Sequence, residues 1–228
     1  MKRISFLPAI FFLAAAVNAQ NVFTLKDASK DFDICIDVGT CDSGIHEGLC
    51  GPVKIAFFRK NNSKAFQTIR LSKTEMMDPV PKANIILGYD DQSMINFDDF
   101  NFDGKEDVAI CDGTNGGYGM PSYRVYIYSP SRKRFVYSSA FTKMNEGGLG
   151  MFQTEKRKKR HFVFTKSGCC WHQTQGFDVF RGRPRKVFEF TEAILGYQPE
   201  TVEITTSKLV HGKWRTWVKH AKTSEYYK

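Results

Sequence analysis

The residues whose types and spacing are best suited to chemistry lie in the acidic stretch 97–110. Side chains that carry oxygen stand at positions 1, 3, 5 and 9 of a loop in this stretch, and a glycine stands at position 6. In that order these residues are Asp99, Asn101, Asp103, Asp107 and Gly104. Because alternate side chains of an extended chain point the same way, the oxygens at the first three positions converge on one point.

The glycine allows the chain to close around that point. Gly104 can adopt backbone angles that other residues avoid, so the chain reverses there and brings round the carbonyl of Lys105 and the carboxylate of Asp107. Several hard oxygens in a flexible cage suit Ca²⁺, whereas Mg²⁺ needs a stricter octahedron and usually retains water. The sequence therefore predicts a calcium loop whose ligands are Asp99, Asn101, Asp103, Lys105 and Asp107.

This loop differs from an EF-hand. An EF-hand loop needs a bidentate glutamate at position 12, where this chain has Ile110, and residues 94–97 and 108–111 have a β pattern. Phe100 and Phe102 alternate with the ligands, and we expect them to anchor the loop in a core. The alternative is an acidic turn that binds nothing, which the four ligand positions and the glycine disfavour. A structural role is the default for calcium in a loop between two strands.

A glycine-rich stretch, residues 113–119, follows soon after the acidic loop. Glycines permit unusual backbone angles, so the stretch is compatible with holding Tyr118 out as an amphipathic anchor, as protein-binding loops do. It is equally compatible with a mobile surface loop. It is not a nucleotide cradle, because it leads into a strand and offers no helix N-terminus to a phosphate.

Catalytic groups are not evident. The five histidines have no recognisable serine or cysteine partner motif, and Glu47 and Glu146 are isolated. Adjacent Cys169 and Cys170 together with His172 are compatible with a soft-metal site, but an oxidising compartment favours a vicinal disulfide or two separate bridges. We therefore expect no catalytic residues and a protein that is not an enzyme.

The elements that position these residues follow an export signal. Lys2 and Arg3 precede an apolar run, residues 4–17, and Val-Asn-Ala ends at Ala19, which predicts a signal peptide over residues 1–19. The apolar run is too short to span a membrane. Without the signal the net charge falls from +9 to about +7, which favours an acidic partner or an anionic surface. Nucleic acid is disfavoured because the protein is exported and has no stacking motif. We expect a periplasmic or secreted protein.

All six cysteines lie beyond the signal, and an even number in an exported protein predicts disulfides. The candidates are Cys35, Cys41, Cys50, Cys111, Cys169 and Cys170. We expect residues 20–51 to form a loop-rich N-terminal segment held by a bridge such as Cys41–Cys50 or Cys35–Cys50. We expect residues 52–228 to form the calcium-binding β domain.

The pattern of the chain beyond residue 52 is that of an all-β protein. Short runs of β-forming residues alternate with polar or glycine turns, as residues 53–58 and 65–71 do. Further hairpins are predicted within residues 123–137, 177–190 and 202–218. A helical period is almost absent, although residues 191–195 are compatible with a short helix. We expect an antiparallel, propeller-like or sandwich-like β domain with one calcium loop.

Two basic turns, residues 156–160 and 181–186, are typical of solvated surface. Together they are also compatible with a contact to anionic lipid or to an acidic protein.

Four segments together resemble an exported bacterial family. They are the acidic loop at residues 99–110, the glycine-rich stretch at 113–119 with its Tyr118, Tyr-Arg-Val-Tyr-Ile-Tyr at 123–128 and Ser-Gly-Cys-Cys-Trp-His at 167–172. The acidic loop alone is similar to the calcium loop of FG-GAP, VCBS and integrin-type repeats, which is a broad signal. The order of the four segments is more specific. The best-understood type in this family is a calcium-binding, propeller-like immunity protein that blocks lysozyme-like toxins delivered by a type IV secretion system.

The resemblance implies a non-catalytic inhibitor whose calcium shapes a loop that plugs the cleft of a glycan hydrolase. By analogy with lysozyme inhibitors, the expected partner-binding residues are Thr114, Asn115, Tyr118 and Tyr123. We therefore expect an exported calcium-binding protein that binds and inhibits a lysozyme-like peptidoglycan hydrolase. The alternative is a calcium-stabilised surface or adhesion module that binds glycan or the anionic envelope.

Overall fold

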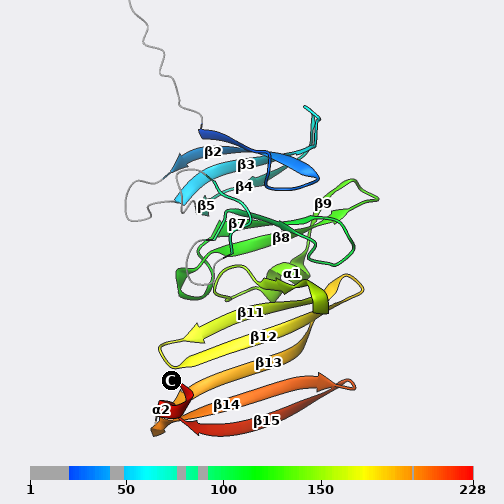
Figure 1. Cartoon of the computed structure of the whole chain (residues 1–228). Coiled ribbons are helices and arrows are strands. Elements are labelled where there is room, and N and C mark those ends of the chain that lie inside the picture. Colours follow the sequence, from blue (N-terminus) through cyan, green and yellow to red (C-terminus); the bar gives the residue numbers. More distant parts are fainter. Residues whose placement is uncertain (1–20, 42–48, 76–80, 87–91, 197, 228) are drawn as a thin grey trace, which may run out of the picture.

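A computed structural model describes residues 21–41, 49–75, 81–86, 92–196 and 198–227 of the chain, so the predicted signal peptide lies outside the described residues. The fold is almost entirely β, and it consists of three antiparallel sheets that follow one another from the N-terminus to the C-terminus (Figure 1). The predicted antiparallel all-β class is confirmed. In the described ranges, no helix is long and apolar enough to cross a membrane.

The first sheet has the strand order β1-β2-β3-β4, with β5 paired to β3. Its strands are β1 (Asn21–Leu25), β2 (Phe32–Cys41), β3 (Leu49–Arg59), β4 (Ala65–Leu71) and β5 (Thr74–Glu75). The expectation of a loop-rich segment over residues 20–51 is therefore wrong. In β2, Phe32, Ile34, Ile36 and Val38 alternate with polar residues, and only these four point into the core. The acidic residues and glycines of this segment are typical of loops, and the alternating apolar residues of a half-buried strand were overlooked among them.

The second sheet has the order β6-β7-β8-β9. Its strands are β6 (Ile95–Asp98), β7 (Asp107–Gly113), β8 (Ser122–Ser129) and β9 (Arg134–Tyr137). Strand β7 is covered on both faces, since Val108, Ala109, Ile110 and Cys111 are all buried. A strand buried on both faces has a continuous apolar run instead of an alternating one.

The third sheet has the order β10-β11-β12-β13-β14-β15. Its strands are β10 (Gln153–Glu155), β11 (Arg160–Ser167), β12 (Trp171–Phe180), β13 (Arg183–Leu195), β14 (Gln198–Val210) and β15 (Lys213–Lys222). The short helices are η1 (Gly117–Gly119), α1 (Ser139–Met144), η2 (Lys156–Lys158) and α2 (Thr223–Tyr226). Residues 191–195 belong to β13, so the short helix considered there is wrong, because they pair with β12 and β14.

The hairpins predicted from alternation and turn residues are present. Strands β3 and β4 pair across residues 60–64, and β8 pairs with β9 across 130–133. Strands β12 and β13 pair across Arg181 and Gly182, and β14 pairs with β15 across residues 211–212. In such pairs the hydrophobic alternation and the turn together set the register.

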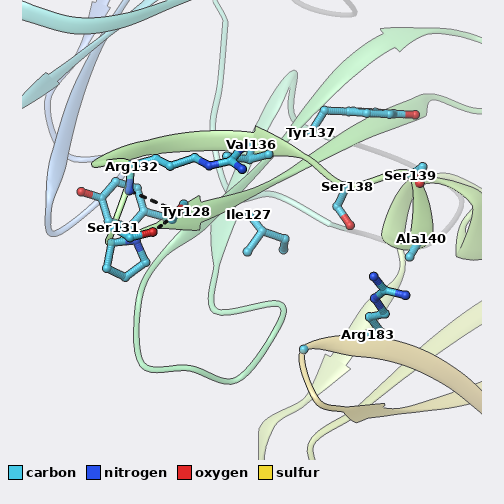
Figure 2. Close-up of a pocket in the computed structure, with 13 residues that line it drawn as sticks. Ile127, Tyr128, Ser131, Arg132, Val136, Tyr137, Ser138, Ser139, Ala140 and Arg183 are labelled. Carbon is cyan, nitrogen blue, oxygen red and sulfur yellow. Dashed lines mark hydrogen bonds between the residues drawn. The ribbon is translucent and has the colours of Figure 1, made fainter.

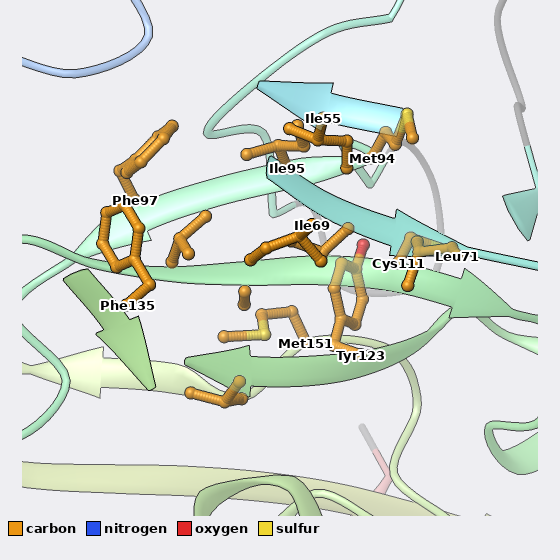
Figure 3. Packing of buried hydrophobic residues seen from close by; sticks show 14 of the residues in the cluster. Ile55, Ile69, Leu71, Met94, Ile95, Phe97, Cys111, Tyr123, Phe135 and Met151 are labelled. Atoms are coloured by element: carbon orange, nitrogen blue, oxygen red, sulfur yellow. The ribbon is translucent and has the colours of Figure 1, made fainter. Parts of the chain in front are cut away.

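The main core lies between the first and second sheets, which face each other as in a sandwich (Figure 3). Aromatic rings fill one end of it, where Phe57 and Phe135 lie 4.9 Å apart between ring centroids and Phe32 lies 5.1 Å from Phe135. A second part of the same core, including Phe100 and Phe152, lies beneath α1 and β11. The central sheet is therefore held from both sides, and it carries the acidic loop.

Two disulfides are present among the described cysteines. Cys41 and Cys50 pair across β2 and β3, which confirms one of the two bridges considered for this segment. Cys169 and Cys170 form a vicinal disulfide at the β11–β12 turn, which is one of the two arrangements considered for these cysteines. Cys35 keeps a free thiol, and the buried Cys111 thiol points to the carbonyl of Gly113, so neither forms a predicted disulfide.

Candidate functional site

The acidic loop, residues 99–106, connects β6 to β7, as the sequence predicted. The two strands pair with Asp98 opposite Asp107, so the loop closes directly on the last rung of the ladder. Phe97 and Val108, the next pair along, are buried. A short connection between two buried strands has fixed ends, so its side chains are positioned by the sheet below them.

Hydrogen bonds from the loop's own backbone turn its first three polar side chains inward. The Asp99 carboxylate accepts from the N–H groups of Asp103 at 2.9 Å and Gly104 at 2.7 Å. The amide oxygen of Asn101 also accepts from the N–H of Asp103, at 3.0 Å, and the Asp103 carboxylate accepts from the N–H of Lys105, at 2.9 Å. Gly104 has φ of 85°, a conformation that favours glycine. These turns gather the three side chains that the sequence predicts as ligands.

Asp107 lies beneath the loop and ties its two ends together. One carboxylate oxygen accepts from the N–H groups of Phe100 at 2.9 Å and Asn101 at 3.2 Å, and the other accepts from the N–H of Tyr128 at 2.8 Å. The side chain is fully buried, and this burial raises the pKa of Asp107 to about 7. A carboxylate has about four acceptor positions, so three hydrogen bonds leave one for an ion.

The donor set fits a hard cation in part. Asp99, Asn101, Asp103 and the Lys105 carbonyl offer oxygen ligands on one short loop, and the nearby Asp103 charge contributes to the raised pKa of Asp107. Among the described residues, no group of three or more His, Cys, Asp and Glu side chains is arranged to hold a metal. A cation held here would need an amide and a backbone carbonyl as well as carboxylates. An oxygen-only donor set is one that Ca²⁺ prefers and Zn²⁺ does not.

His161 supports the loop from below, which the sequence did not indicate. It is fully buried on β11, and its Nε2 lies 2.8 Å from the carbonyl oxygen of Phe100. A carbonyl can only accept, so Nε2 donates. The other ring nitrogen, Nδ1, then accepts from the hydroxyl of Thr154, whose oxygen lies 3.1 Å from it. Burial lowers the pKa of His161, in agreement with this neutral form. The Phe102 ring stacks on the imidazole at 5.1 Å.

Of the two phenylalanines expected to anchor the loop, Phe100 is buried in the core. Phe102 is partly exposed and has φ of 58°, so it caps His161 at the surface instead of entering the core. The link between His161 and the loop joins residues 61 positions apart, and a single sequence offers no signal for such a contact.

The glycine-rich loop lies at the other end of β7 and holds Tyr118 outward. Tyr118 is 59% exposed and has φ of 57°, so an L-residue occupies a left-handed conformation at this point. Its hydroxyl accepts a hydrogen bond from the N–H of Gly168, beside the vicinal disulfide. The ammonium of Lys166 lies 4.7 Å from the centre of the Tyr118 ring. The tyrosine is therefore exposed and braced at the same time.

Close backbone contacts fix the rest of this loop. The N–H of Gly117 donates to the carbonyl of Gly148 at 2.9 Å, and the N–H of Gly116 donates to that of Met120 at 2.9 Å. A Cβ on Gly116 would lie 2.5 Å from the Met120 carbonyl oxygen, so only glycine fits there. These contacts favour the anchor interpretation of the stretch over the mobile-loop interpretation.

The four predicted partner-binding residues divide into two groups. Thr114, Asn115 and Tyr118 are exposed on the same loop. Tyr123 is buried, and its hydroxyl donates to the carbonyl of Ser93 at 2.8 Å, so its assignment to the binding surface is wrong. The alternation of β8 explains the error, since Tyr123 and Val125 face the core while Arg124 faces outward. Lys166, which the sequence analysis did not single out, joins the surface beside Tyr118.

Comparison with known proteins shows what this fold is similar to. A solved structure described as "Structure of a Xanthomonas Type IV Secretion System related protein" superposes with a TM-score of 0.70 and 18% sequence identity. The alignment covers 89% of this chain and 96% of that chain. At this identity the likeness shows a shared fold. No protein-family model matches the chain, and no curated protein matches it in sequence.

Proposed function

We propose that this chain is an exported, non-catalytic inhibitor of a lysozyme-like peptidoglycan hydrolase that is associated with a type IV secretion system. The observation that carries the proposal is Tyr118, a tyrosine 59% exposed at the tip of a loop that its neighbours hold rigid. A rigid aromatic side chain can enter a cleft with little loss of conformational entropy. The shared fold with a type IV secretion system related protein supports the biological setting.

The electrostatics beside Tyr118 fit the cleft of a glycan hydrolase. Such enzymes place two carboxyl groups on either side of the scissile bond. The Lys166 ammonium, 4.7 Å from the ring centre, would bring a positive charge to those carboxylates when the ring occupies a sugar subsite. Thr114 and Asn115 would contact the rim of the cleft, where polar contacts dominate.

Calcium has a structural part in the proposal. Asp99, Asn101, Asp103, Asp107 and the Lys105 carbonyl would hold the ion, whose charge offsets the repulsion between their carboxylates. The acidic loop and the Tyr118 loop lie at the two ends of β7, about 20 Å apart at about 3.4 Å per residue. The ion therefore acts on Tyr118 through the stability of the central sheet and does not touch the partner.

The test is inhibition of peptidoglycan lysis by the purified chain in calcium buffer. We expect the chain to slow the lysis of a peptidoglycan suspension by the producer's own hydrolases or effectors, without lytic turnover of its own. Tyr118→Ala should weaken this inhibition by about 30-fold or more, the size of an aromatic hot spot. The matched control is Tyr137→Ala, since Tyr137 is also exposed but lies on β9.

Two results would contradict the proposal. One is the absence of inhibition across the producer's full set of hydrolases and effectors. The other is equal loss of inhibition in the Tyr118 and Tyr137 variants, which would remove Tyr118 from the contact. EDTA should reduce inhibition in parallel with the fraction of folded protein, measured by circular dichroism on the same samples.

A further inference from the structure

One side of the molecule gathers the turns of three β-hairpins, and these turns are strongly basic. They are the β8–β9, β12–β13 and β14–β15 turns, which lie toward the right in Figure 1. The pairing of β12 through β15 places the last two turns at the same end of the third sheet. The segments 129–134, 180–186 and 208–215 contain ten lysine and arginine residues and no acidic residue. Among the described residues, Lys186 alone of the ten forms an ion pair, with Glu189.

Exposed aromatic rings lie among these charges. Phe180 is 60% exposed at the end of β12, and Trp214 is 44% exposed at the start of β15. The Arg181 guanidinium carbon lies 5.2 Å from the centre of the Phe180 ring, and the Lys186 ammonium lies 5.9 Å from that of Trp214. Aromatic rings beside basic groups are the side chains that settle at the interface between lipid and water.

A hollow lies between two of the hairpins (Figure 2). It has a volume of about 690 Å³ and is formed by the β8–β9 hairpin, the start of α1 and the β12–β13 turn. Arg132 lines it on one side and Arg183 on the other, with the hydroxyl group of Ser138 between them (Figure 2). None of the described lining residues is acidic, and neither arginine forms an ion pair with another described residue. Guanidinium groups bind phosphate oxygens in pairs of hydrogen bonds.

From this arrangement we propose that the side formed by these three turns docks on an anionic phospholipid bilayer. A headgroup phosphate occupies the hollow between Arg132 and Arg183, while Phe180 and Trp214 enter the headgroup layer. A bilayer fits better than an acidic protein, because the aromatic rings stand at the outer ends of hairpins and not in a concave pocket. The Tyr118 loop adjoins the opposite end of the third sheet, at the β11–β12 turn, so a docked chain keeps Tyr118 accessible. This inference does not depend on the proposed inhibition.

The test is sedimentation of the whole chain with phosphatidylcholine vesicles that contain or lack phosphatidylglycerol. We expect binding to the vesicles with phosphatidylglycerol, loss of binding in high salt, and a blue shift of tryptophan emission as Trp214 leaves water. Equal binding to both kinds of vesicle, or no blue shift in the bound state, would overturn the proposal. These readouts use the unaltered chain, so they do not depend on the folding of a variant.

Variants then locate the contact. Arg132→Gln with Arg183→Gln should lower the partition coefficient onto phosphatidylglycerol vesicles roughly 30-fold, since each basic residue near an anionic surface contributes about fivefold. The control is Lys73→Gln with Lys222→Gln, which removes the same charge from exposed positions away from the three turns and should change binding by about twofold or less. Equal losses in the two double variants would contradict a localised site.

Two further arms separate the bilayer from other anions. Phe180→Ser leaves the charge unchanged and should still weaken vesicle binding several-fold. Vesicle binding as strong as that of the wild-type chain would contradict insertion of the ring. Inorganic phosphate should displace the chain from vesicles no better than chloride of the same ionic strength. Displacement by phosphate alone would assign the hollow to a free anion and overturn docking on a bilayer.

Discussion

At the scale of single residues, the acidic loop depends on carboxylates that are held by backbone N–H groups. Asp107 accepts three such bonds, two from the start of the loop and one from β8, and Asp99 accepts two from the loop itself. The loop therefore has its shape before any ion is added, which lowers the entropic cost of binding one. Its remaining cost is repulsion between carboxylates, and a cation would offset that repulsion.

Asp99→Asn tests the cation directly. The carboxylate accepts from Asp103 and from Gly104 on different oxygens, so the neutral side chain keeps one of these two hydrogen bonds while the loop loses a charged ligand. We expect calcium well above its dissociation constant to raise the Tm of the wild-type chain by about 5 °C or more, and that of the variant far less. Differential scanning calorimetry with calcium and with EDTA measures this shift.

The control for this change is Asp37→Asn. Asp37 is an aspartate of β2 whose partner is Lys54, at 3.1 Å. It should keep the full calcium response. An Asp99→Asn chain that responds to calcium as strongly as the Asp37→Asn chain would show that the loop is not the site of the ion.

His161 gives the loop a dependence on pH. Burial lowers the folded-state pKa of His161 below its usual value, so the unfolded chain binds a proton more readily. The contribution of neutral His161 to the free energy of unfolding is therefore fully present above about pH 6.5, and it is lost as the pH falls toward the lowered pKa. In EDTA, His161→Gln should lose less stability than wild type between about pH 7 and pH 5, measured by urea unfolding.

Asp107 changes stability in the opposite direction. Its folded-state pKa is raised to about 7, so its contribution to the free energy of unfolding falls as the pH rises toward 7. It is present in both chains, so the difference between wild type and His161→Gln isolates the histidine. Parallel pH profiles for the two chains would show that His161 is not held neutral. The glutamine can still donate to the carbonyl of Phe100, so the variant retains this hydrogen bond and differs from wild type in the titrating group.

At the scale of elements, much of the fold could be predicted from the sequence. The β8–β9, β12–β13 and β14–β15 hairpins follow from alternation on each side of a glycine or polar turn, and the acidic loop lies between two strands as expected. Strand β2 was missed because its outward positions include Asp33 and Asp37, and aspartate is depleted in strands. Helix α1 was missed because its six residues make fewer than two turns, too short for a period to show.

The site could be predicted only where its residues are close in sequence. The inward turn of Asp99, Asn101 and Asp103 and the exposure of Tyr118 could be predicted, because each lies within one loop. The supports of these loops were not found, since His161 and Gly168 reach them from β11 and from its following turn. Tyr123 was misplaced because a tyrosine suits a surface and a core equally, and only the register of β8 decides.

The vicinal disulfide provides a test of how one turn positions another. Gly168 precedes the Cys169–Cys170 bridge and donates to the Tyr118 hydroxyl. Replacing both cysteines by serine should loosen that turn and weaken hydrolase inhibition by roughly tenfold, because Tyr118 would then lose conformational entropy on binding. The Tm should change little, since the bridge closes no long loop.

The Cys41–Cys50 bridge is the natural comparison for that change. It links β2 to β3, and replacing both of its cysteines by serine should destabilise the chain by about 2–5 kcal/mol without weakening inhibition at a temperature where the chain is folded. If the Cys169 and Cys170 double variant instead behaved like this one, the β11–β12 turn would be a stabilising element and not a support for Tyr118.

At the scale of the whole molecule, the central sheet links the two loops. Strand β7 begins at Asp107, is buried on both faces, and ends where the Tyr118 loop begins. The second sheet lies between the first sheet and the third, so its position depends on packing from both sides. The basic hairpin turns and the braced Tyr118 lie toward different ends of the third sheet, which leaves each surface accessible while the other is occupied.

Packing between the first two sheets is open to a stability test. Phe57 is fully buried and lies 4.9 Å from Phe135 and 6.5 Å from Phe97 between ring centroids. Phe57→Ala should lower the free energy of unfolding by about 3–5 kcal/mol because it leaves a cavity. Phe180→Ala, at a ring 60% exposed, should change it by about 0.5 kcal/mol or less. Equal effects in urea unfolding would contradict the position of this core.

The most direct measurement of the central claim replaces Tyr118 by a photo-crosslinking phenylalanine and illuminates the chain with its cognate hydrolase in calcium buffer. The proposal predicts a cross-linked product whose modified hydrolase peptides border the two catalytic carboxylates, and no such product when the same group replaces Tyr137. Cross-links that fall outside the substrate cleft, or that form from position 137 and not from 118, would contradict it.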